Sequence, residues 1–489
     1  MKYDPTRMVE LKKLIHSEAK GDLPEITLKK VAVGKNLVEQ VPSLLDEISG
    51  GRINRVLIVT DESLIKWRGR SLRDAIVTIL HKRGIETEIL ALKSDETGLL
   101  HADIYNVMIV RSEMRPGVCV IGIGGGTIAD ICKYATYLEE QEKYGMGQIP
   151  LVVCQTATSG SAFGSNQSVI FKDGVKRTFY SIYPSIVFAD MDVIAEAPRE
   201  LNLSGFGDMI AVLISPLDWY VSHAIGMSPG HCELLVDIMQ DSGRALLGIS
   251  RQVGEVSPEG MEVLAKILVM MGIVSSMGYG TTPISGFEHM ISHALDMQGL
   301  ATGRKLALHG AQVGLGAAYA SVAYNLFVQE FSPERLDLDL CYPTDKEAFE
   351  DIAGRFAHLD PEGKTIEEIW AHYKEKVLLW RKNRPSFEKF LADWNKPGGP
   401  REQMLTEIKP AEQIIEALFL AGNPTSSEKL VPPVSEDEMK FAFLNARFMR
   451  NRFIIADILG FTGMMNENFW HRVNQEVRRI KCDLCGTTT

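Results

Sequence analysis

The sequence has no uninterrupted hydrophobic run long enough to cross a membrane. Its longest apolar stretch covers residues 261–277 and is broken by Lys266, whereas a transmembrane helix needs about 20 consecutive apolar residues. A buried core helix is therefore the expected structure of this stretch. A secretory signal is not expected either, because the opening residues, MKYDPTRMVELKK, contain no apolar segment.

Cysteine is also sparse, and acidic side chains outnumber basic ones. The chain has seven cysteines, and most are isolated within apolar runs. Such usage is typical of a reduced intracellular protein rather than of a disulfide-stabilised domain, so we expect a cytoplasmic location. The formal net charge is −11, which argues against nucleic acid as a partner but leaves room for one basic pocket that binds a single phosphate.

The first part of the chain alternates between apolar strands and helices. Near-continuous apolar runs occur at RVLIVTD, VCVIGIG and IPLVVC, and runs of this kind predict a parallel sheet that is covered on both faces. A chain of 489 residues is too long for one ordinary core. We therefore predict an α/β domain over residues 1–199.

The pattern changes after Pro198. Long segments with helical periodicity occur at 207–225, 260–280, 306–330 and 438–460. They predict an all-helical domain over residues 200–489. Inside it, residues 328–435 are charged and punctuated by prolines, and we expect helices joined by long surface loops there.

A glycine turn links one predicted strand to the following helix. Gly124, Gly125 and Gly126 would let the backbone approach a pyrophosphate closely, and the N–H groups at the helix start could hold its oxygens. A tight turn without a ligand is the alternative. Asp61 ends an earlier strand, where it could accept hydrogen bonds from a ribose hydroxyl or cap the next helix.

Three polar residues stand out in apolar segments of the helical part. They are Asp208 in SGFGDMIA, His289 in SGFEHMISHAL and His309 in LHGAQVGLG. One carboxylate and two imidazoles with an open fourth position make a catalytic site for zinc or a similar ion. Each histidine alone is more often structural, and spacing along the chain does not show that Asp208 meets the histidines in space.

These segments resemble the iron-containing alcohol dehydrogenase and dehydroquinate synthase superfamily, and most closely its glycerol-1-phosphate dehydrogenases. The resemblance rests on five motifs in order, GIGGGTIADICKY, YPSIVFADMDVIAEAP, GFGDMIA, SGFEHMISHALD and ALHGAQVGLG. It spans about residues 30 to 330 and implies a dehydroquinate synthase-like fold. The α/β domain would bind NAD(H) or NADP(H), and the helical domain would bind one divalent metal.

The resemblance also implies roles for individual residues. It makes Asp208, His289 and His309 the metal ligands, and His293 a group near the substrate. Contacts to the nucleotide would come from a larger set: Asp61, Gly124, Gly125, Gly126, Thr127, Asp130, Thr156, Thr158, Ser161 and Lys176. Zinc is the expected ion, while nickel, iron and manganese suit the same ligands.

The sequence departs from the family pattern in two places. A Gln155-Thr-Ala-Thr-Ser-Gly-Ser161 segment stands where these dehydrogenases have a His-Asp pair, and Ala311 replaces a glutamate. The expected reaction is reduction of a small ketone, most simply dihydroxyacetone phosphate to glycerol 1-phosphate. Alternatives are a sugar-phosphate cyclase, which would have glutamate in place of Asp208, a dehydrogenase for an unphosphorylated alcohol, and a non-catalytic relative.

Further expectations concern partners. A phosphorylated substrate would need a cation near the metal. The candidates are Arg304, Lys305 and three arginines on the last long helical segment, Arg447, Arg450 and Arg452. A small-molecule substrate and a homo-oligomer are expected. Cys482 and Cys485 form a single CxxC, which is either half of a zinc site or part of a frayed terminus.

Overall fold

The structure is a computed structural model that describes the chain except residues 96, 97, 99, 116, 173, 174, 361, 362 and 487–489. The described chain forms two compact units. The first contains residues 1–209 and 244–280, and the second contains residues 210–243 and 281–489. The boundary predicted at residue 199 lies close to the end of the first segment, but residues 244–280, expected in the helical domain, pack within the first unit.

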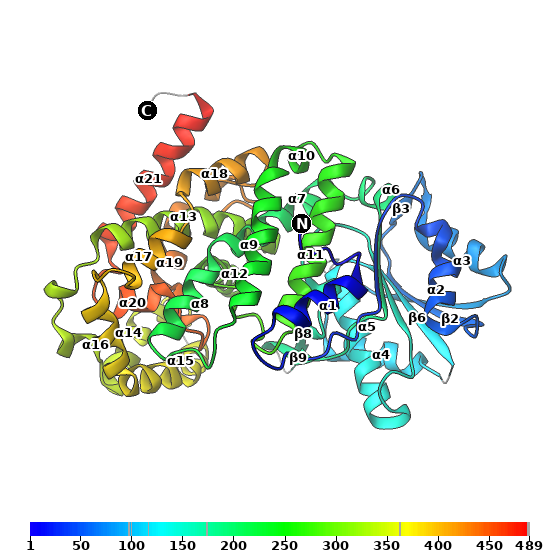
Figure 1. The fold of residues 1–489 in the computed structure, drawn as a ribbon, viewed down its shortest axis with the longest axis horizontal. Coiled ribbons are helices and arrows are strands. Elements are labelled where there is room, and N and C mark those ends of the chain that lie inside the picture. Colours follow the sequence, from blue (N-terminus) through cyan, green and yellow to red (C-terminus); the bar gives the residue numbers. More distant parts are fainter. Residues whose placement is uncertain (96–97, 99, 116, 173–174, 361–362, 487–489) are drawn as a thin grey trace. The chain divides into compact units, whose positions relative to one another are not determined.

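A six-stranded parallel sheet forms the centre of the first unit (Figure 1). Its strand order is β1 (Lys30–Gly34), β10 (Ile186–Asp190), β7 (Leu151–Gln155), β6 (Val118–Gly124), β2 (Arg55–Asp61) and β5 (Glu86–Leu92). All residues of β6, β7 and β10 are buried. Strands buried on both faces explain the near-continuous apolar runs of the sequence, and the predicted parallel sheet is confirmed.

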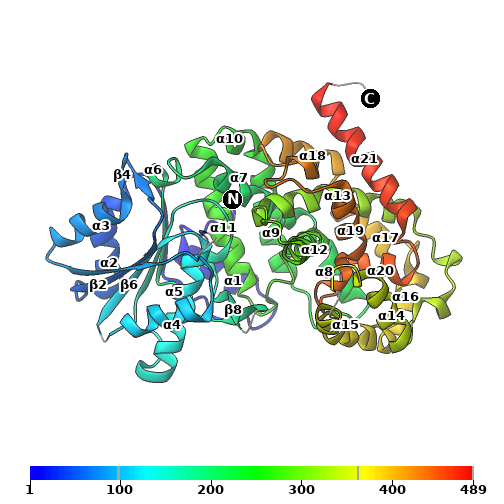
Figure 2. The same cartoon turned by 180° about the vertical axis from the view of Figure 1, so that it is seen from behind.

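Helices cover both faces of this sheet, as Figures 1 and 2 show. Side chains of β2, β6 and β7 share one apolar core with α2 (Val41–Ser49) and α3 (Leu72–His81). On the other face, α5 (Gly126–Glu139) packs against β6 and β7 and contacts α4 (Ile104–Glu113). This sandwich fixes the turn between β6 and α5, where the three consecutive glycines lie.

The apolar stretch at residues 261–277 forms the helix α11 (Pro258–Ser275) of the first unit. A Cβ atom at Gly272 would lie 2.6 Å from the carbonyl oxygen of Ser161, and one at Gly164 would overlap the carbonyl oxygen of Val269. Helix α11 therefore approaches the segment after β7 backbone to backbone. Among the described residues, no helix is long and apolar enough to cross a membrane.

The described residues of the second unit contain helices and no strand, which confirms the expected largely helical C-terminal region. In chain order, the described elements are η4 (Ile210–Leu213), α8 (Ser215–Ala224), α9 (Glu233–Gly248, which continues into the first unit), α12 (Phe287–Thr302), α13 (His309–Glu330), η5 (Pro333–Arg335), η6 (Leu338–Cys341), α14 (Asp345–Phe356), α15 (Lys364–Lys382), α16 (Arg384–Asp393), α17 (Pro400–Glu407), α18 (Ala411–Leu420), η7 (Ser427–Lys429), α19 (Glu436–Asn445), η8 (Ala446–Phe448), α20 (Ile455–Phe461) and α21 (Glu467–Cys485). Helix α12 packs against α13 and α19.

Residues 328–435 are more regular than expected, because helices α14 to α18 occupy much of this range. Several of the prolines that suggested loops begin helices instead. Pro385 is the second residue of α16 and Pro400 is the first residue of α17, and proline in the first turn of a helix costs no hydrogen bond. The expected long loops are therefore mostly short connections.

The long helix expected over residues 438–460 is interrupted, and this prediction was wrong. Helix α19 ends at Asn445, η8 follows, and α20 begins at Ile455. The break is held by buried charges: Lys376 Nζ donates to the Arg447 carbonyl oxygen at 2.6 Å, and the Ile455 N–H donates to Asp218 at 2.6 Å. Backbone groups that an unbroken helix would pair internally are bound by these side chains.

Candidate metal centre

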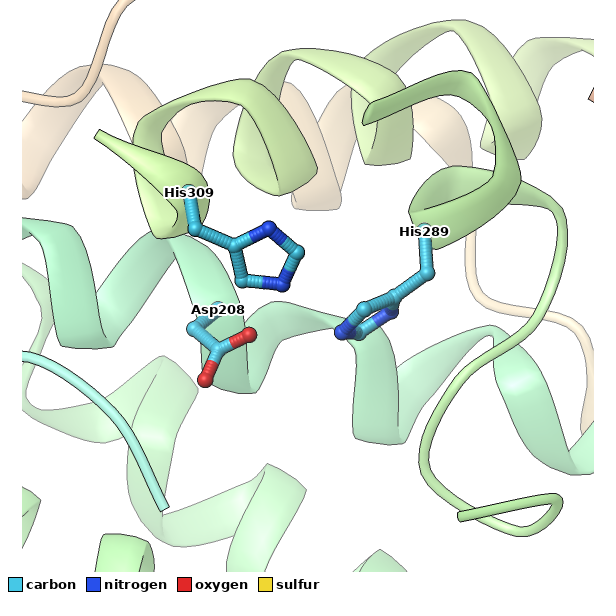
Figure 3. Close-up of side chains that lie close together, drawn as sticks. All are labelled: Asp208, His289 and His309. Atoms are coloured by element: carbon cyan, nitrogen blue, oxygen red, sulfur yellow. The ribbon is translucent and has the colours of Figure 1, made fainter. Parts of the chain in front are cut away.

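Three of the predicted residues come together. The ligand atoms of Asp208, His289 and His309 all lie within 4.8 Å of one another (Figure 3). Asp208 belongs to the last turn of α7 (Arg199–Met209), His289 to the first turn of α12, and His309 begins α13. Asp208 and His289 are buried, whereas His309 is exposed. One carboxylate and two imidazoles could hold a divalent ion and leave it a further position for another ligand.

Both imidazoles are engaged at their Nδ1 atoms. His289 Nδ1 lies 2.9 Å from Glu288 Oε1, and His309 Nδ1 lies 3.2 Å from Ser292 Oγ. An imidazole has two nitrogens, so Nε2 is the atom that each ring can offer to a metal. In Figure 3, each ring turns one nitrogen toward the other labelled side chains. The donor set therefore fits a shared cation.

His293 lies one helical turn after His289 on α12 and is partly exposed. Its ring centre is 5.9 Å from that of His309, and the ring centres of His289 and His309 are 5.4 Å apart. The three histidines therefore form one group around the start of α13.

A second carboxylate lies behind this group. Asp218 on α8 accepts hydrogen bonds from the Phe287 N–H at 2.7 Å and from the Ile455 N–H at 2.6 Å. Burial, together with the negative charge of Glu288, raises the pKa of Asp218 to about 7. Asp218 thus ties the first residue of α12 to α20 within the second unit.

The glycine turn has the form that the sequence predicted. Gly124 ends β6, Gly125 caps α5 and Gly126 begins it. A Cβ atom at Gly124 would lie 2.5 Å from Ile128 Cγ1, whereas one at Gly125 would meet nothing within 4 Å. Gly124 is therefore required for packing, and the space beside Gly125 could admit a phosphate at the start of α5.

The other residues predicted to bind the nucleotide have different surroundings. Asp130 Oδ2 accepts from the Val169 N–H at 3.1 Å, and Asp130 Oδ1 pairs with the fully buried Lys133 at 3.0 Å. Thr158 is buried, and its N–H and hydroxyl bind Asn202 of α7 at 3.0 Å each. These contacts fix the turn and the segment after β7 in place.

Three of the remaining predicted residues, Asp61, Thr156 and Thr127, lie at the ends of strands of the six-stranded sheet or directly after them. Asp61 ends β2 and accepts from the Ser63 N–H at 2.9 Å. Thr156 is buried directly after β7, Ser161 is partly exposed, and Thr127 lies in the first turn of α5. Lys176 belongs to β9 (Val175–Tyr180), and its side chain lies outside the described part of the structure.

The structure adds residues that the sequence did not reveal. Glu288, Ser292 and Asp218 contact the histidines or the start of α12, yet none was a candidate. Glu288 directly precedes His289 in the SGFEH motif, and that adjacency was the one available signal. Cys482 and Cys485 lie in the last turn of α21 rather than in a frayed terminus, and among the described residues they belong to no metal-binding group.

Comparisons with known proteins bear on the family. Residues 32–198 match the family model of the iron-containing alcohol dehydrogenases. The chain is 29% identical over 300 residues to the NAD(P)+ glycerol-1-phosphate dehydrogenase of Halalkalibacterium halodurans, covering 61% of this chain and 71% of that protein. It is 28% identical over 316 residues to the Bacillus subtilis enzyme of the same name, covering 63% and 76%.

Solved structures support the fold. Glycerol dehydrogenase from Schizosaccharomyces pombe matches with a TM-score of 0.57 and 15% identity, over 94% of both chains. Alcohol dehydrogenase from Oenococcus oeni matches with a TM-score of 0.54 and 15% identity, over 91% of this chain and 99% of that one. At such identities the likeness concerns the fold, and it confirms the predicted architecture of a parallel α/β sheet followed by a helical region.

The enzyme class expected from the sequence, an NAD(P)-dependent, metal-containing dehydrogenase, is confirmed at the level of the family. The Asp/His/His cluster is the candidate metal site that such an enzyme requires. Residues 32–198 are therefore similar to the iron-containing alcohol dehydrogenases, and the chain is distantly related to the glycerol-1-phosphate dehydrogenases.

Proposed function

We propose that this protein transfers a hydride between NAD(P)H and a small ketone, and that its substrate is dihydroxyacetone phosphate, reduced to glycerol 1-phosphate. The observation that carries the proposal is the convergence of Asp208, His289 and His309. The names of the similar bacterial dehydrogenases support the choice of substrate.

Asp208, His289 and His309 would hold one divalent ion, with zinc as the expected metal. When bound, the ion supplies a Lewis acid for the carbonyl group of the substrate. Asp208 is the one charged residue of the three, so a divalent ion would keep a net positive charge there. The exposure of His309 suits a site that a small molecule enters.

His293 would donate the proton that the substrate oxygen gains during reduction. An imidazole exchanges a proton near neutral pH, and the ring of His293 is near that of His309. The nucleotide would lie along the carboxyl edge of the sheet, with its pyrophosphate at Gly125, Gly126 and Thr127. We propose that the other parts of the nucleotide contact six further residues: Asp61, Asp130, Thr156, Thr158, Ser161 and Lys176.

A phosphorylated substrate needs a cation. Arg304 donates to Glu438 at 3.1 Å, Arg447 donates to Asp351 at 2.9 Å, and Arg452 donates to Thr281 at 2.6 Å. Arg450 is exposed, and the negative charge of Glu368 acts on it. Lys305 is exposed as well. It also precedes His309 by four positions, so we assign the phosphate to Lys305.

A dehydrogenase for an unphosphorylated alcohol is the second candidate. Phosphate recognition usually draws on more than one cation. Three of the candidate cations, Arg304, Arg447 and Arg452, already bind other groups, and this favours an unphosphorylated substrate.

The test follows NADH oxidation by the metal-loaded protein with dihydroxyacetone phosphate and, in parallel, with dihydroxyacetone. Turnover of the phosphorylated ketone that is lost in His309→Ala supports the first candidate. Turnover of both ketones at similar kcat/KM supports the second. No turnover of either by a protein that binds metal would contradict the proposed reaction.

Lys305→Ala supplies the matched variant. It should raise the KM for dihydroxyacetone phosphate and leave kcat/KM for dihydroxyacetone unchanged, because only the phosphorylated ketone needs the cation. Lys346→Ala, at another exposed lysine in α14, should change neither. Equal KM values in Lys305→Ala and the unmodified protein would remove Lys305 from the site.

A further inference from the structure

The two candidate metal-binding histidines have unlike partners at Nδ1. His289 faces a carboxylate, Glu288, at 2.9 Å, whereas His309 faces a hydroxyl, that of Ser292, at 3.2 Å. An ionised carboxylate only accepts hydrogen bonds, so Glu288 requires the His289 proton on Nδ1. A hydroxyl can donate or accept, so Ser292 imposes no such requirement on His309.

One oxygen of the Glu288 carboxylate is hydrogen-bonded and the other is not. It is fully buried, and Oε1 accepts from the Gly286 N–H at 2.6 Å as well as from His289. Oε2 has no hydrogen-bond partner among the described residues. A buried charge with few partners is costly, and a cation bound by His289 would lower that cost.

The surroundings leave Glu288 little freedom to move. A Cβ atom at Gly316 of α13 would lie 2.5 Å from the Glu288 carbonyl oxygen, so α13 packs directly against the Glu288 backbone. A Cβ atom at Gly286 would overlap Asp218 Oδ2 and lie 3.1 Å from Glu288 Oε2. The absence of a side chain at Gly286 therefore makes room for the two buried carboxylates, and its absence at Gly316 lets α13 approach the Glu288 backbone.

One cation belongs to this environment. Arg452 donates hydrogen bonds to the Ser285 carbonyl oxygen and to Thr281 Oγ1, and its charge interacts favourably with Glu288 and Asp218. Both hydrogen bonds go to the loop before α12, and within the described part of the chain Arg452 donates to neither carboxylate. Arg452 therefore does not compete for the hydrogen bond between Glu288 Oε1 and His289 Nδ1.

We propose that Glu288 is a positioning residue for the metal site, which fixes His289 as the Nδ1–H tautomer and leaves Nε2 as the metal ligand. Its negative charge makes the imidazole a stronger donor than the serine-backed His309. Glu288 does not touch the metal or the substrate; it acts through His289. This inference rests on the proposed metal-dependent function.

The test measures metal affinity without catalysis. The full-length protein is stripped with a chelator, and zinc binding is measured by competition with a chromophoric chelator for the unmodified protein, Glu288→Ala, Glu288→Gln and Ser292→Ala. Removing a carboxylate behind a ligating histidine lowers metal affinity about 10–100-fold, and we expect this range for Glu288→Ala. Glu288→Gln keeps an accepting oxygen but loses the charge, so its affinity should fall between those of Glu288→Ala and the unmodified protein.

A matched control separates positioning from folding. Glu139 of α5 is also a fully buried glutamate with hydrogen bonds to Arg111 and Lys143 at 2.9 Å each. Glu139→Gln should lower thermal stability and leave zinc affinity unchanged. The visible spectrum of bound cobalt should differ between Glu288→Gln and the unmodified protein, because the donor strength of His289 changes, and should be unaltered in Glu139→Gln.

The outcomes are distinguishable. Unchanged zinc affinity in Glu288→Gln, with an unchanged cobalt spectrum, would overturn the role of Glu288 while the metal site stands. Failure of the unmodified protein to bind zinc or cobalt would overturn both the metal site and the inference. Zinc binding that depends on Glu288 in a protein without NADH turnover would contradict only the proposed reaction.

Discussion

Individual thiols of this protein differ widely in their surroundings. Cys119, Cys132 and Cys154 are fully buried, and burial raises the pKa of Cys132 to about 12. Cys232 and Cys482 are partly exposed, and Cys485 is exposed. Because the thiolate is the reactive form, exposure and burial should divide the cysteines into two reactivity classes.

Native protein treated with a thiol reagent should therefore label at Cys232, Cys482 and Cys485 and be protected at the buried cysteines. All seven should label after denaturation. Mass spectrometry of peptides from both samples identifies the sites. Fast native labelling of Cys132 or Cys154 would contradict the packing of α5 and β7.

Buried tyrosines predict a fall in stability at alkaline pH. Burial raises the pKa of Tyr183 from its usual 10.0 to about 12, so the unfolded chain loses this proton first as the pH rises. Stability is then unaffected below pH 10 and falls between pH 10 and 12, by up to about 1.4 kcal/mol per pH unit for this group.

Denaturant unfolding at several pH values measures this slope. Tyr183→Phe should reduce it, and Tyr105→Phe, at a side chain that is 71% exposed, should not. A slope that is identical in Tyr183→Phe and the unmodified protein would contradict the burial of Tyr183.

Single site residues could be predicted from the sequence where the residue type stands out within its own motif. Asp208, His289 and His309 are polar residues in apolar segments, and they do converge. Asp218 and Ser292 could not be predicted, because their roles depend on contacts with residues distant in the chain, such as Ile455 and His309. Periodicity shows which face of a helix is buried but not which partner it meets.

At the scale of elements, the position of Asp208 depends on how closely α7 approaches the segment after β7. A Cβ atom at Gly205 would overlap the carbonyl oxygen of Thr158. Gly205 precedes Asp208 by three residues in the same helix, so a displacement of one displaces the other.

Gly205→Ala should therefore lower the free energy of unfolding by about 1–3 kcal/mol, as overpacking typically does, and weaken zinc binding. Gly354→Ala is the matched control, because Gly354 is in helix α14 and a Cβ atom there would meet nothing within 4 Å. It should be neutral or stabilising by about 0.5–1 kcal/mol. Equal zinc affinities in the two variants would show that α7 can move without disturbing Asp208.

Element prediction was best for the strands and weakest near residue 450. The strands are buried on both faces, so their apolar runs are unambiguous. The break between α19 and α20 could not be predicted, because the groups that hold it, Lys376 and Asp218, lie far away in the sequence.

At the scale of the whole molecule, the first unit is built from two separate segments of chain, residues 1–209 and 244–280. The second segment contains α11, whose Gly272 packs against Ser161 of the first. A fragment of residues 1–199, the domain predicted from sequence, would therefore lack part of its own core. The expected homo-oligomer and cytoplasmic location stay predictions.

The fragment 1–199 should show no cooperative thermal transition, whereas the full chain should unfold cooperatively. Circular dichroism of both, recorded during heating, measures the difference. The physical reason is that removing α11 exposes the apolar surface that this helix covers. A sharp transition in the isolated fragment would mean that the first 199 residues are a complete domain.

The discontinuous first unit also has a consequence for biosynthesis. A ribosome releases the chain in order, at about 5–20 residues per second, so residues 210–243 emerge before α11 does. For several seconds the nascent first unit lacks α11, and apolar surface exposed in that interval is prone to aggregation. We therefore expect this protein to depend on chaperones during the translation of the stretch that precedes Gly280, and much less once that point has passed.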